Sequence, residues 1–345
     1  MSVAVFYPCR PYCTDKDVIE EILPNGVENL YPVINFPPQD SVLSKRAEFL
    51  SLLRDPSIET LMVWRGGRIE DDGNPWKSSF ELLKNLTDED WAEIKKHPKN
   101  IVGYSDATYL LCSLLSHGIN CFYGPNYNAT LQCSSEKELK ATLEYLAQAL
   151  ESKVDYTINL NDEKLTAGGN EPWTFCGGTA TGRLIGGNLD TIYNLLKMEE
   201  YASTFMPQHG DILFLEEIDP YYDGIENLEE KTVEKPAMSN IVGMLDKLKF
   251  LKKAGVFSKI SGLLFGRSKE PNTNYADIVL PDDQISSNLA EKRYLEEYIR
   301  CIIPSSIPIL ANIACSHTHP MVTLPLGKII TMDATAQTLT VHEHE

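Results

Sequence analysis

Basic residues are scarce in this sequence. Its 31 lysines and arginines face 49 aspartates and glutamates, which gives the 345 residues a formal net charge of −18. A protein that binds the phosphate backbone of nucleic acid needs a basic surface, so nucleic acid is not expected as a partner. The same acidic excess would be repelled by an anionic membrane surface. We therefore expect neither nucleic acid nor a membrane as a partner, while a locally basic pocket for a small acidic ligand is compatible with this charge.

Long apolar runs and paired cysteines are also missing. No run reaches the length of a membrane span, and "MSVAVFYPCRPYC" lacks the basic start and long apolar stretch of a secretory signal. These two absences predict a cytoplasmic protein. None of the eight cysteines forms a Cys-x-x-Cys pair, and most lie in apolar runs such as "YLLCSLL". We therefore expect mostly buried free thiols and no disulfide framework.

The first half of the chain alternates short apolar strands with helices. Strands are expected at 2–8, 27–33, 58–67 and 100–102, and helices at 14–23, 41–56, 87–98 and 106–117. Such alternation predicts an α/β fold with a parallel sheet covered on both faces. Ligands of such sheets gather at the carboxyl ends of the strands. Both "RGG" and "YSD" lie at ends of this kind.

The pattern changes between residues 136 and 170, where a long helix is followed by a polar stretch. We place the domain boundary there and expect an N-terminal domain at 1–160 and a C-terminal domain at 161–345. The second half contains further apolar strands, among them "GDILFLEE" and "ISGLLFGR". It ends in "KIITMDATAQTLTVHE", which is typical of a β-hairpin with a polar turn.

The turn "GYSD" places Ser105 between a strand and an amphipathic helix. Gly103 permits a tight backbone, and the helix N-terminus stabilises negative charge near the serine. Ser105 is therefore a candidate nucleophile, with the N–H of Asp106 as a candidate oxyanion donor. Serine is also a preferred N-cap, and Ala107 stands where a Gly-x-Ser-x-Gly motif has its second glycine. The local pattern leaves both interpretations open and favours the cap.

A nucleophilic serine needs a base and an acid that orients the base. Two of the seven histidines, His317 and His319, follow the apolar strand "PILANIA" in a turn closed by proline. The strand "ILFLEE" ends in Glu216 and Glu217, one of which is a candidate acid. Ordinary solvation is the alternative for paired acids at the end of a strand.

Taken together and in this order, these residues resemble the LD-carboxypeptidase family of serine peptidases, which includes the microcin C immunity carboxypeptidases. The resemblance covers nearly the whole chain. Its marks are "RAEFLSLLRDPSIETLMVWRGG", "HPKNIVGYSDATYLL", "GRLIGGNLDTI", "ILFLEE", "ISGLLFGR" and "CSHTHPMVTLPLG".

The resemblance implies a flavodoxin-like N-terminal domain with a parallel sheet and a smaller C-terminal domain with a barrel-like sheet. It also implies a homodimer and a catalytic triad of Ser105, Glu216 and His317. The oxyanion donors would be the backbone N–H groups of Gly67 and Asp106. Two positions depart from the family pattern: Ser316 replaces the usual glycine before the histidine, and His319 stands where an acid is common.

The implied function is that of a serine carboxypeptidase that hydrolyses an amide bond through an acyl-enzyme, a mechanism that requires no metal or cofactor. We favour a peptidyl or aminoacyl nucleotide as the substrate, as in microcin immunity. The alternative is removal of the terminal D-alanine from a murein tetrapeptide. Candidate substrate-binding residues are Trp173, Asn188 and His319, with Trp173 stacking on the base or else packing at the domain boundary.

Two further hypotheses stay open at this point. One is a non-catalytic binding protein on the same fold, which an intact triad disfavours. The other is an enzyme with a cysteine nucleophile, which is disfavoured because Cys112 lies within the helix and not at its turn.

Overall fold

The computed structural model describes residues 3–6, 8, 33–35, 42–63, 78–127, 135–167, 170–205, 207–217, 236–267 and 287–343. The helix expected at 14–23 and most of the strand expected at 27–33 lie outside these ranges. The chain forms two compact units. The first comprises Met1–Lys153, Ser203–Phe205 and His319–Lys328, and the second comprises Val154–Ala202, Met206–Thr318 and Ile329–Glu345.

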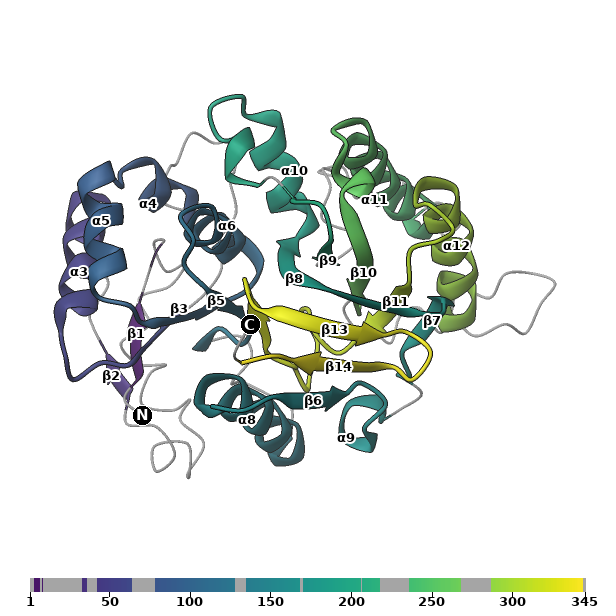
Figure 1. Ribbon diagram of the computed structural model, residues 1–345, viewed down its shortest axis with the longest axis horizontal. Helices are drawn as coiled ribbons and strands as arrows, with labels where there is room; N and C mark the ends of the chain where they lie inside the picture. Colours follow the sequence, from purple (N-terminus) through teal and green to yellow (C-terminus); the bar gives the residue numbers. More distant parts are fainter. Residues whose placement is uncertain are drawn as a thin grey trace. The chain divides into compact units, whose positions relative to one another are not determined.

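The first unit is built on a mainly parallel sheet (Figure 1). Its described strands are ordered β12-β5-β4-β3-β1-β2. They span β1 (Val3–Phe6), β2 (Val33–Asn35), β3 (Thr60–Val63), β4 (Asn100–Gly103), β5 (Cys121–Tyr123) and β12 (Leu324–Leu326). Strands β1 to β5 are parallel and β12 is antiparallel to β5. The order 2-1-3-4-5 is that of flavodoxin-like folds, so the expected N-terminal architecture is confirmed.

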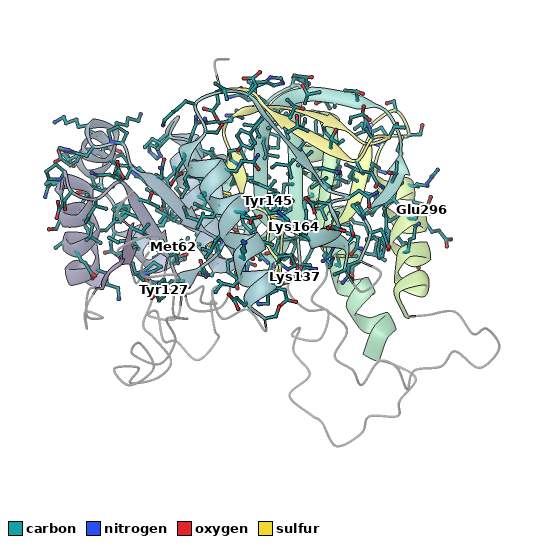
Figure 2. The ribbon with its side chains drawn as sticks, turned by 90° about the horizontal axis from the view of Figure 1, so that it is seen from below. Met62, Tyr127, Lys137, Tyr145, Lys164 and Glu296 are labelled. Atoms are coloured by element: carbon teal, nitrogen blue, oxygen red, sulfur yellow. The ribbon has the colours of Figure 1, made fainter. Side chains whose placement is uncertain are left out.

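Alternate residues of each strand project to opposite faces of this sheet. Because these residues are largely apolar, helices pack on the sheet. The helices of this unit include α3 (Val42–Arg54), α4 (Phe80–Lys84), α5 (Asp88–Lys96), α6 (Thr108–Ser116) and α8 (Glu136–Glu151). One core cluster joins strand residues such as Val5, Met62 and Val102 to Leu143 of α8. Met62 and Tyr127 of this cluster are labelled in Figure 2.

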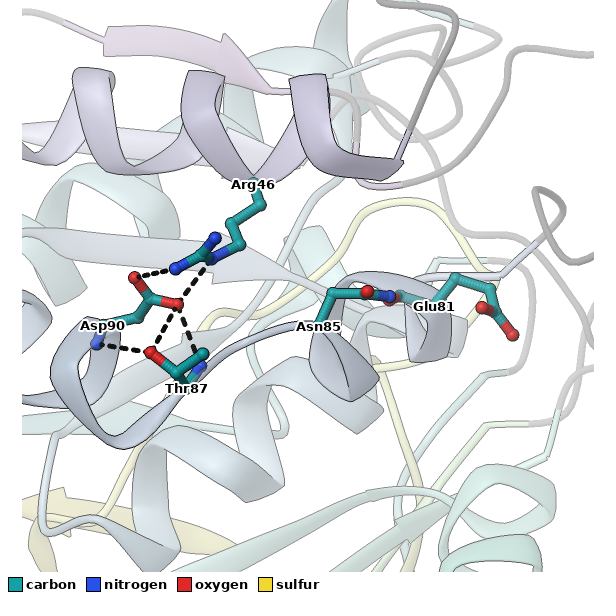
Figure 3. Close-up of polar contacts among 5 residues, drawn as sticks. All are labelled: Arg46, Glu81, Asn85, Thr87 and Asp90. Atoms are coloured by element: carbon teal, nitrogen blue, oxygen red, sulfur yellow. Dashed lines mark hydrogen bonds and ion pairs between the residues drawn. The ribbon is translucent and has the colours of Figure 1, made fainter.

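Helix α5 begins with a capping box that also anchors α3 (Figure 3). The Thr87 N–H donates to Asp90 Oδ2 over 2.8 Å, and the Asp90 N–H donates back to Thr87 Oγ1 over 3.4 Å. Arg46 of α3 forms a two-pronged ion pair with the same carboxylate, with N–O distances of 2.6 and 2.9 Å. One aspartate therefore fixes the start of α5 and its contact with α3.

The second unit contains a longer sheet, whose described strands are ordered β6-β14-β13-β8-β9-β10-β11-β7. They span β6 (Tyr156–Asn159), β7 (Trp173–Cys176), β8 (Thr179–Asn188), β9 (Asp211–Glu216), β10 (Ile260–Gly266), β11 (Ile309–Ile313), β13 (Ile329–Asp333) and β14 (Thr338–Val341). The four central strands, β8 to β11, are parallel. The outer strands are antiparallel to their neighbours, and β13 with β14 forms the expected terminal hairpin.

Three long helices pack together in the second unit (Figure 1): α10 (Leu189–Lys197), α11 (Pro236–Lys253) and α12 (Ser287–Ile302). A short helix, α9 (Glu163–Thr166), follows β6. All residues of β9 and β11 are buried, as expected for central parallel strands. The resemblance implied a smaller second domain, whereas the two units are of similar length. Among the described helices, none is both long and apolar enough to cross a membrane.

Candidate active site

Ser105 occupies a sharp turn between β4 and α6. Tyr104 is extended, with φ −146° and ψ 179°, and Ser105 then adopts φ +62°. A residue with a side chain pays about 1–2 kcal/mol for this left-handed conformation. The chain continues through a single 3₁₀ turn, Ser105–Ala107, into α6. A strained serine between a strand and a helix is the geometry of a nucleophile elbow.

Neighbouring side chains hold this turn in place. The Ser105 N–H donates to Tyr123 Oη over 2.9 Å, and the Tyr104 N–H donates to Asn126 Oδ1 over 3.3 Å. A Cβ at Gly103 would lie 2.9 Å from the Ala107 Cβ, so only glycine allows the strand and the turn to approach this closely. The strain at Ser105 is therefore supported by contacts on both sides of the turn.

The side chain of Asp106 ties the turn to the start of α4. Its Oδ1 accepts from Ser78 Oγ over 2.5 Å, and its Oδ2 accepts from the Ser79 N–H over 2.6 Å. Its backbone carbonyl accepts from Ser79 Oγ over 2.6 Å. Asp106 is only 4% exposed, so these bonds are shielded from water. Sequence reasoning named Asp106 for its backbone N–H and missed this second role.

The interpretation of Ser105 as a helix cap is wrong. The N-cap positions of the 3₁₀ turn and of α6 are Tyr104 and Ala107, and neither makes a side-chain capping bond. Within the first unit, no described residue hydrogen-bonds the Ser105 Oγ.

Glu216 and His317 are brought together in the second unit. Glu216 ends β9 with a side chain that is 0% exposed, and His317 follows β11 with 16% of its side chain exposed. Their Oε2 and Nδ1 atoms are 3.1 Å apart. A buried carboxylate on the Nδ1 side of a partly exposed imidazole can orient that ring and stabilise its charged form. Ser105, in contrast, belongs to the first unit.

Two other donors engage the Glu216 carboxylate. Asn188, the last residue of β8, donates from Nδ2 to Oε1 over 2.9 Å. Its Oδ1 accepts from the Thr191 N–H and so caps α10, which fixes the orientation of the amide. Ser316 donates from Oγ to Oε2 over 2.7 Å. Both carboxylate oxygens are therefore hydrogen-bonded, as a buried charge requires.

Gly266 makes room for this arrangement at the end of β10. A Cβ at this position would lie 2.4 Å from the Cys315 carbonyl oxygen and 2.7 Å from the Glu216 Cβ. Any side chain there would push the histidine loop away from β9. The glycine of "ISGLLFGR" is therefore a structural requirement of the Glu216–His317 pair.

Glu217 is buried too, so solvation does not explain the paired acids. It is 8% exposed, and its Oε2 lies 3.5 Å from Lys247 Nζ of α11. Lys247 also pairs with Asp190, in the first turn of α10. Glu217 thus holds helices while Glu216 holds the histidine. Successive side chains of an extended chain point to opposite faces, so the two neighbouring acids can contact different partners.

The candidate substrate-binding residues are spread over both units. Trp173 lies on the edge strand β7 and not in a loop, with its ring centroid 6.2 Å from that of Phe175. The segment before it is held by Asn312, at φ +56°, which donates to the Glu171 carbonyl over 2.8 Å. His319 belongs to the first unit. Gly67, the second expected oxyanion donor, lies outside the described residues.

Two of the buried thiols are unsuited to catalysis. Burial raises the pKa of Cys112 to about 12. Burial and the charge of Glu216 raise the pKa of Cys315 well above its ordinary value. A thiolate is the reactive form, so neither residue is an activated nucleophile. In the described part of the chain, no group of three or more metal-ligating side chains comes together.

Two family models match this chain. Residues 39–124 match the LD-carboxypeptidase N-terminal domain, and residues 181–332 match the LD-carboxypeptidase C-terminal domain. The microcin C7 self-immunity protein MccF of Escherichia coli is 27% identical over 325 residues, 88% of this chain and 79% of that protein. A "Probable murein peptide carboxypeptidase" of Bacillus subtilis is 27% identical over 298 residues, 86% of this chain and 75% of that protein.

The fold is also found in solved structures. That of MccF in complex with aspartyl sulfamoyl adenosine has a TM-score of 0.71 at 24% identity, covering 99% of this chain and 96% of the other. The two matched domains together span the Ser105 turn, Glu216 and His317. The chain therefore belongs to the LD-carboxypeptidase family and is a serine-type carboxypeptidase.

Proposed function

We propose that Ser105, Glu216 and His317 form the catalytic triad of this carboxypeptidase. The observation that carries the proposal is the combination of a strained serine with a buried carboxylate bonded to Nδ1 of a partly exposed histidine. Because Glu216 occupies Nδ1, the Nε2 of His317 is the nitrogen that receives the serine proton.

The reaction then proceeds through an acyl-enzyme. His317 takes the proton from Ser105 Oγ, which attacks the carbonyl carbon of the scissile amide. The backbone N–H groups of Asp106 and Gly67 bind the oxyanion, an effect of about 3–4 kcal/mol per donor in known enzymes. His317 passes its proton to the leaving nitrogen, and the amine departs. Water, deprotonated by His317, hydrolyses the ester and frees the serine.

We propose a peptidyl or aminoacyl nucleotide as the substrate. The relative MccF is a microcin C7 self-immunity protein, and it has been solved with aspartyl sulfamoyl adenosine. Trp173 offers a half-buried indole for stacking on the base, with Phe175 beneath it. Asn188 and His319 are further proposed contacts. Similarity to the "Probable murein peptide carboxypeptidase" of Bacillus subtilis supports the alternative substrate, a murein tetrapeptide that loses its terminal D-alanine.

One experiment tests both the chemistry and the substrate. The protein is incubated with aspartyl sulfamoyl adenosine or with a murein tetrapeptide, and the products are identified by mass spectrometry. We expect aspartate and sulfamoyl adenosine from the first, and no product with Ser105→Ala. Ser116→Ala, at the far end of α6, is the matched control and keeps full activity. Cleavage of the tetrapeptide alone would overturn the proposed substrate.

A fluorophosphonate probe separates an enzyme from a binding protein. It forms a covalent bond with an activated serine, so wild type is labelled at Ser105 and Ser105→Ala is not. An unlabelled, inactive wild type would favour the non-catalytic binding protein. The resemblance also supports a homodimer, which size-exclusion chromatography with light scattering would test. The cytoplasmic location expected from the sequence would be tested by cell fractionation.

A further inference from the structure

The histidine loop is attached to Glu216 at two successive residues. Ser316 Oγ and His317 Nδ1 contact the same atom, Glu216 Oε2, at 2.7 and 3.1 Å. Ser316 is 1% exposed and Glu216 is 0% exposed, so water does not compete for these bonds. A hydroxyl has one proton, and a carboxylate only accepts, so the direction of the Ser316 bond is fixed.

We propose that Ser316 is a positioning residue that holds the Glu216 carboxylate for His317. The inference rests on the proposed function, because it assigns Ser316 a part in the same Ser105–Glu216–His317 site. A hydrogen bond from a hydroxyl to a carboxylate is short and about twice as strong as one between neutral groups. The 2.7 Å separation of Ser316 Oγ and Glu216 Oε2 fits this class.

The need for such a residue follows from the geometry of the carboxylate. Rotation of the last torsion of a glutamate is soft, so one bond to each oxygen is needed to fix its plane. Asn188 holds Oε1 from β8, and its own amide is locked by capping α10. Ser316 holds Oε2 from the side of the histidine loop. With both in place, Oε2 is presented to Nδ1 in one orientation.

The packing around the loop supports the same role. The end of β10 passes so close that a Cβ at Gly266 would lie 2.4 Å from the Cys315 carbonyl oxygen and 3.3 Å from the Ser316 Cβ. The Cys315 N–H donates to the Ile313 carbonyl over 2.7 Å. These contacts fix the backbone at Ser316, and this backbone position directs the Ser316 hydroxyl toward Glu216.

The test measures turnover and serine reactivity in the full-length protein. Ser316→Ala removes the hydroxyl, Ser316→Thr keeps it, and Ser261→Ala is the matched control. Ser261 lies at the opposite end of β10 and donates to the Gly210 carbonyl over 2.7 Å, so it also loses one hydroxyl bond. Rates are measured with aspartyl sulfamoyl adenosine or the murein tetrapeptide, whichever wild type cleaves, and with a fluorophosphonate probe.

We expect Ser316→Ala to lower kcat and the labelling rate about tenfold with KM unchanged within about twofold, as for one lost bond to a carboxylate. Ser316→Thr recovers most of both rates, and Ser261→Ala matches wild type. A purely structural role would lower the thermal midpoint without slowing the folded enzyme. If Ser316→Ala does not fold, Ser316→Cys, which keeps the volume but donates weakly, replaces it and is expected to be slow.

The two proposals fail in different ways. If the folded Ser316 variants react with the probe and turn over at the wild-type rate, the role of Ser316 is wrong while the triad stands. If wild type is neither labelled at Ser105 nor active, the triad is wrong, whatever the Ser316 variants do.

Discussion

The carboxylate of Asp106 is expected to contribute more to stability than its place in a turn suggests. It accepts from Ser78 Oγ and from the Ser79 N–H, at 2.5 and 2.6 Å. Replacement by alanine leaves both buried donors without this acceptor, at about 1–3 kcal/mol each. We therefore expect Asp106→Ala to lower the free energy of unfolding by about 3–5 kcal/mol.

Asparagine at the same position allows a finer test. Its carboxamide oxygen can accept from the Ser79 N–H, and its NH₂ group can donate to the Ser78 oxygen. Both contacts survive, but the charge is lost. Asp106→Asn is therefore expected to cost only about 1–2 kcal/mol, the difference between charged and neutral hydrogen bonds. Asp106→Asn is expected to be more stable than Asp106→Ala because asparagine can bond both Ser78 and Ser79 and alanine can bond neither.

Urea unfolding of the full chain measures the free energies, and fluorophosphonate labelling measures whether Ser105 keeps its reactivity. Asp55→Ala is a matched control, because Asp55 also accepts from a serine hydroxyl and a backbone N–H, but at an exposed site. Asp55→Ala is expected to lower the free energy of unfolding much less than Asp106→Ala does. Equal losses for Asp106→Ala and Asp55→Ala, or for Asp106→Ala and Asp106→Asn, would refute the reasoning.

Three further predictions concern other parts of the chain. Burial raises the pKa of Glu48 from 4.5 to about 7, so the folded state favours the neutral acid and stability falls as pH rises between these values. The free energy of unfolding of Glu48→Gln should equal that of wild type near pH 4 and exceed it by about 2 kcal/mol above pH 7, allowing for partial exposure of the side chain. Urea unfolding at both pH values measures this difference. Gly266→Ala should lower the free energy of unfolding by about 3 kcal/mol and slow turnover, because its Cβ would lie 2.7 Å from the Glu216 Cβ. Unchanged urea unfolding and unchanged kinetics would contradict this prediction. Iodoacetamide should modify exposed Cys301 in the native protein, and peptide mass mapping should find three buried thiols modified only after unfolding: Cys112, Cys121 and Cys315.

Much of the fold follows from local sequence. The apolar stripes of α3, α5 and α6 and the polar turn of the β13–β14 hairpin depend on residues close together in the chain, and each is found where expected. Alternation of strands and helices also predicts the parallel sheet of the first unit. These features need only side-chain spacing and turn chemistry.

The missed features all depend on distant contacts. The positive φ of Ser105 is supported by Tyr123 and by Asp106, whose partners lie before α4. Ordinary solvation, the alternative for the acid pair, does not hold for Glu217, which is buried and pairs with Lys247 of α11. Ser316 was noticed only as a departure from a family pattern, because nothing in "CSHTHP" says that its hydroxyl meets Glu216.

The place of β12 has a consequence for how the protein is made. Leu324–Leu326 closes the side of β5 in the first sheet, although the rest of that sheet comes from the first 123 residues. A chain leaving the ribosome therefore exposes the edge of β5, with its unpaired N–H and C=O groups, until residues 324–326 have been synthesised. Truncation before residue 324 would make that exposure permanent, so a fragment ending near residue 153 is expected to aggregate unless β12 is grafted onto it.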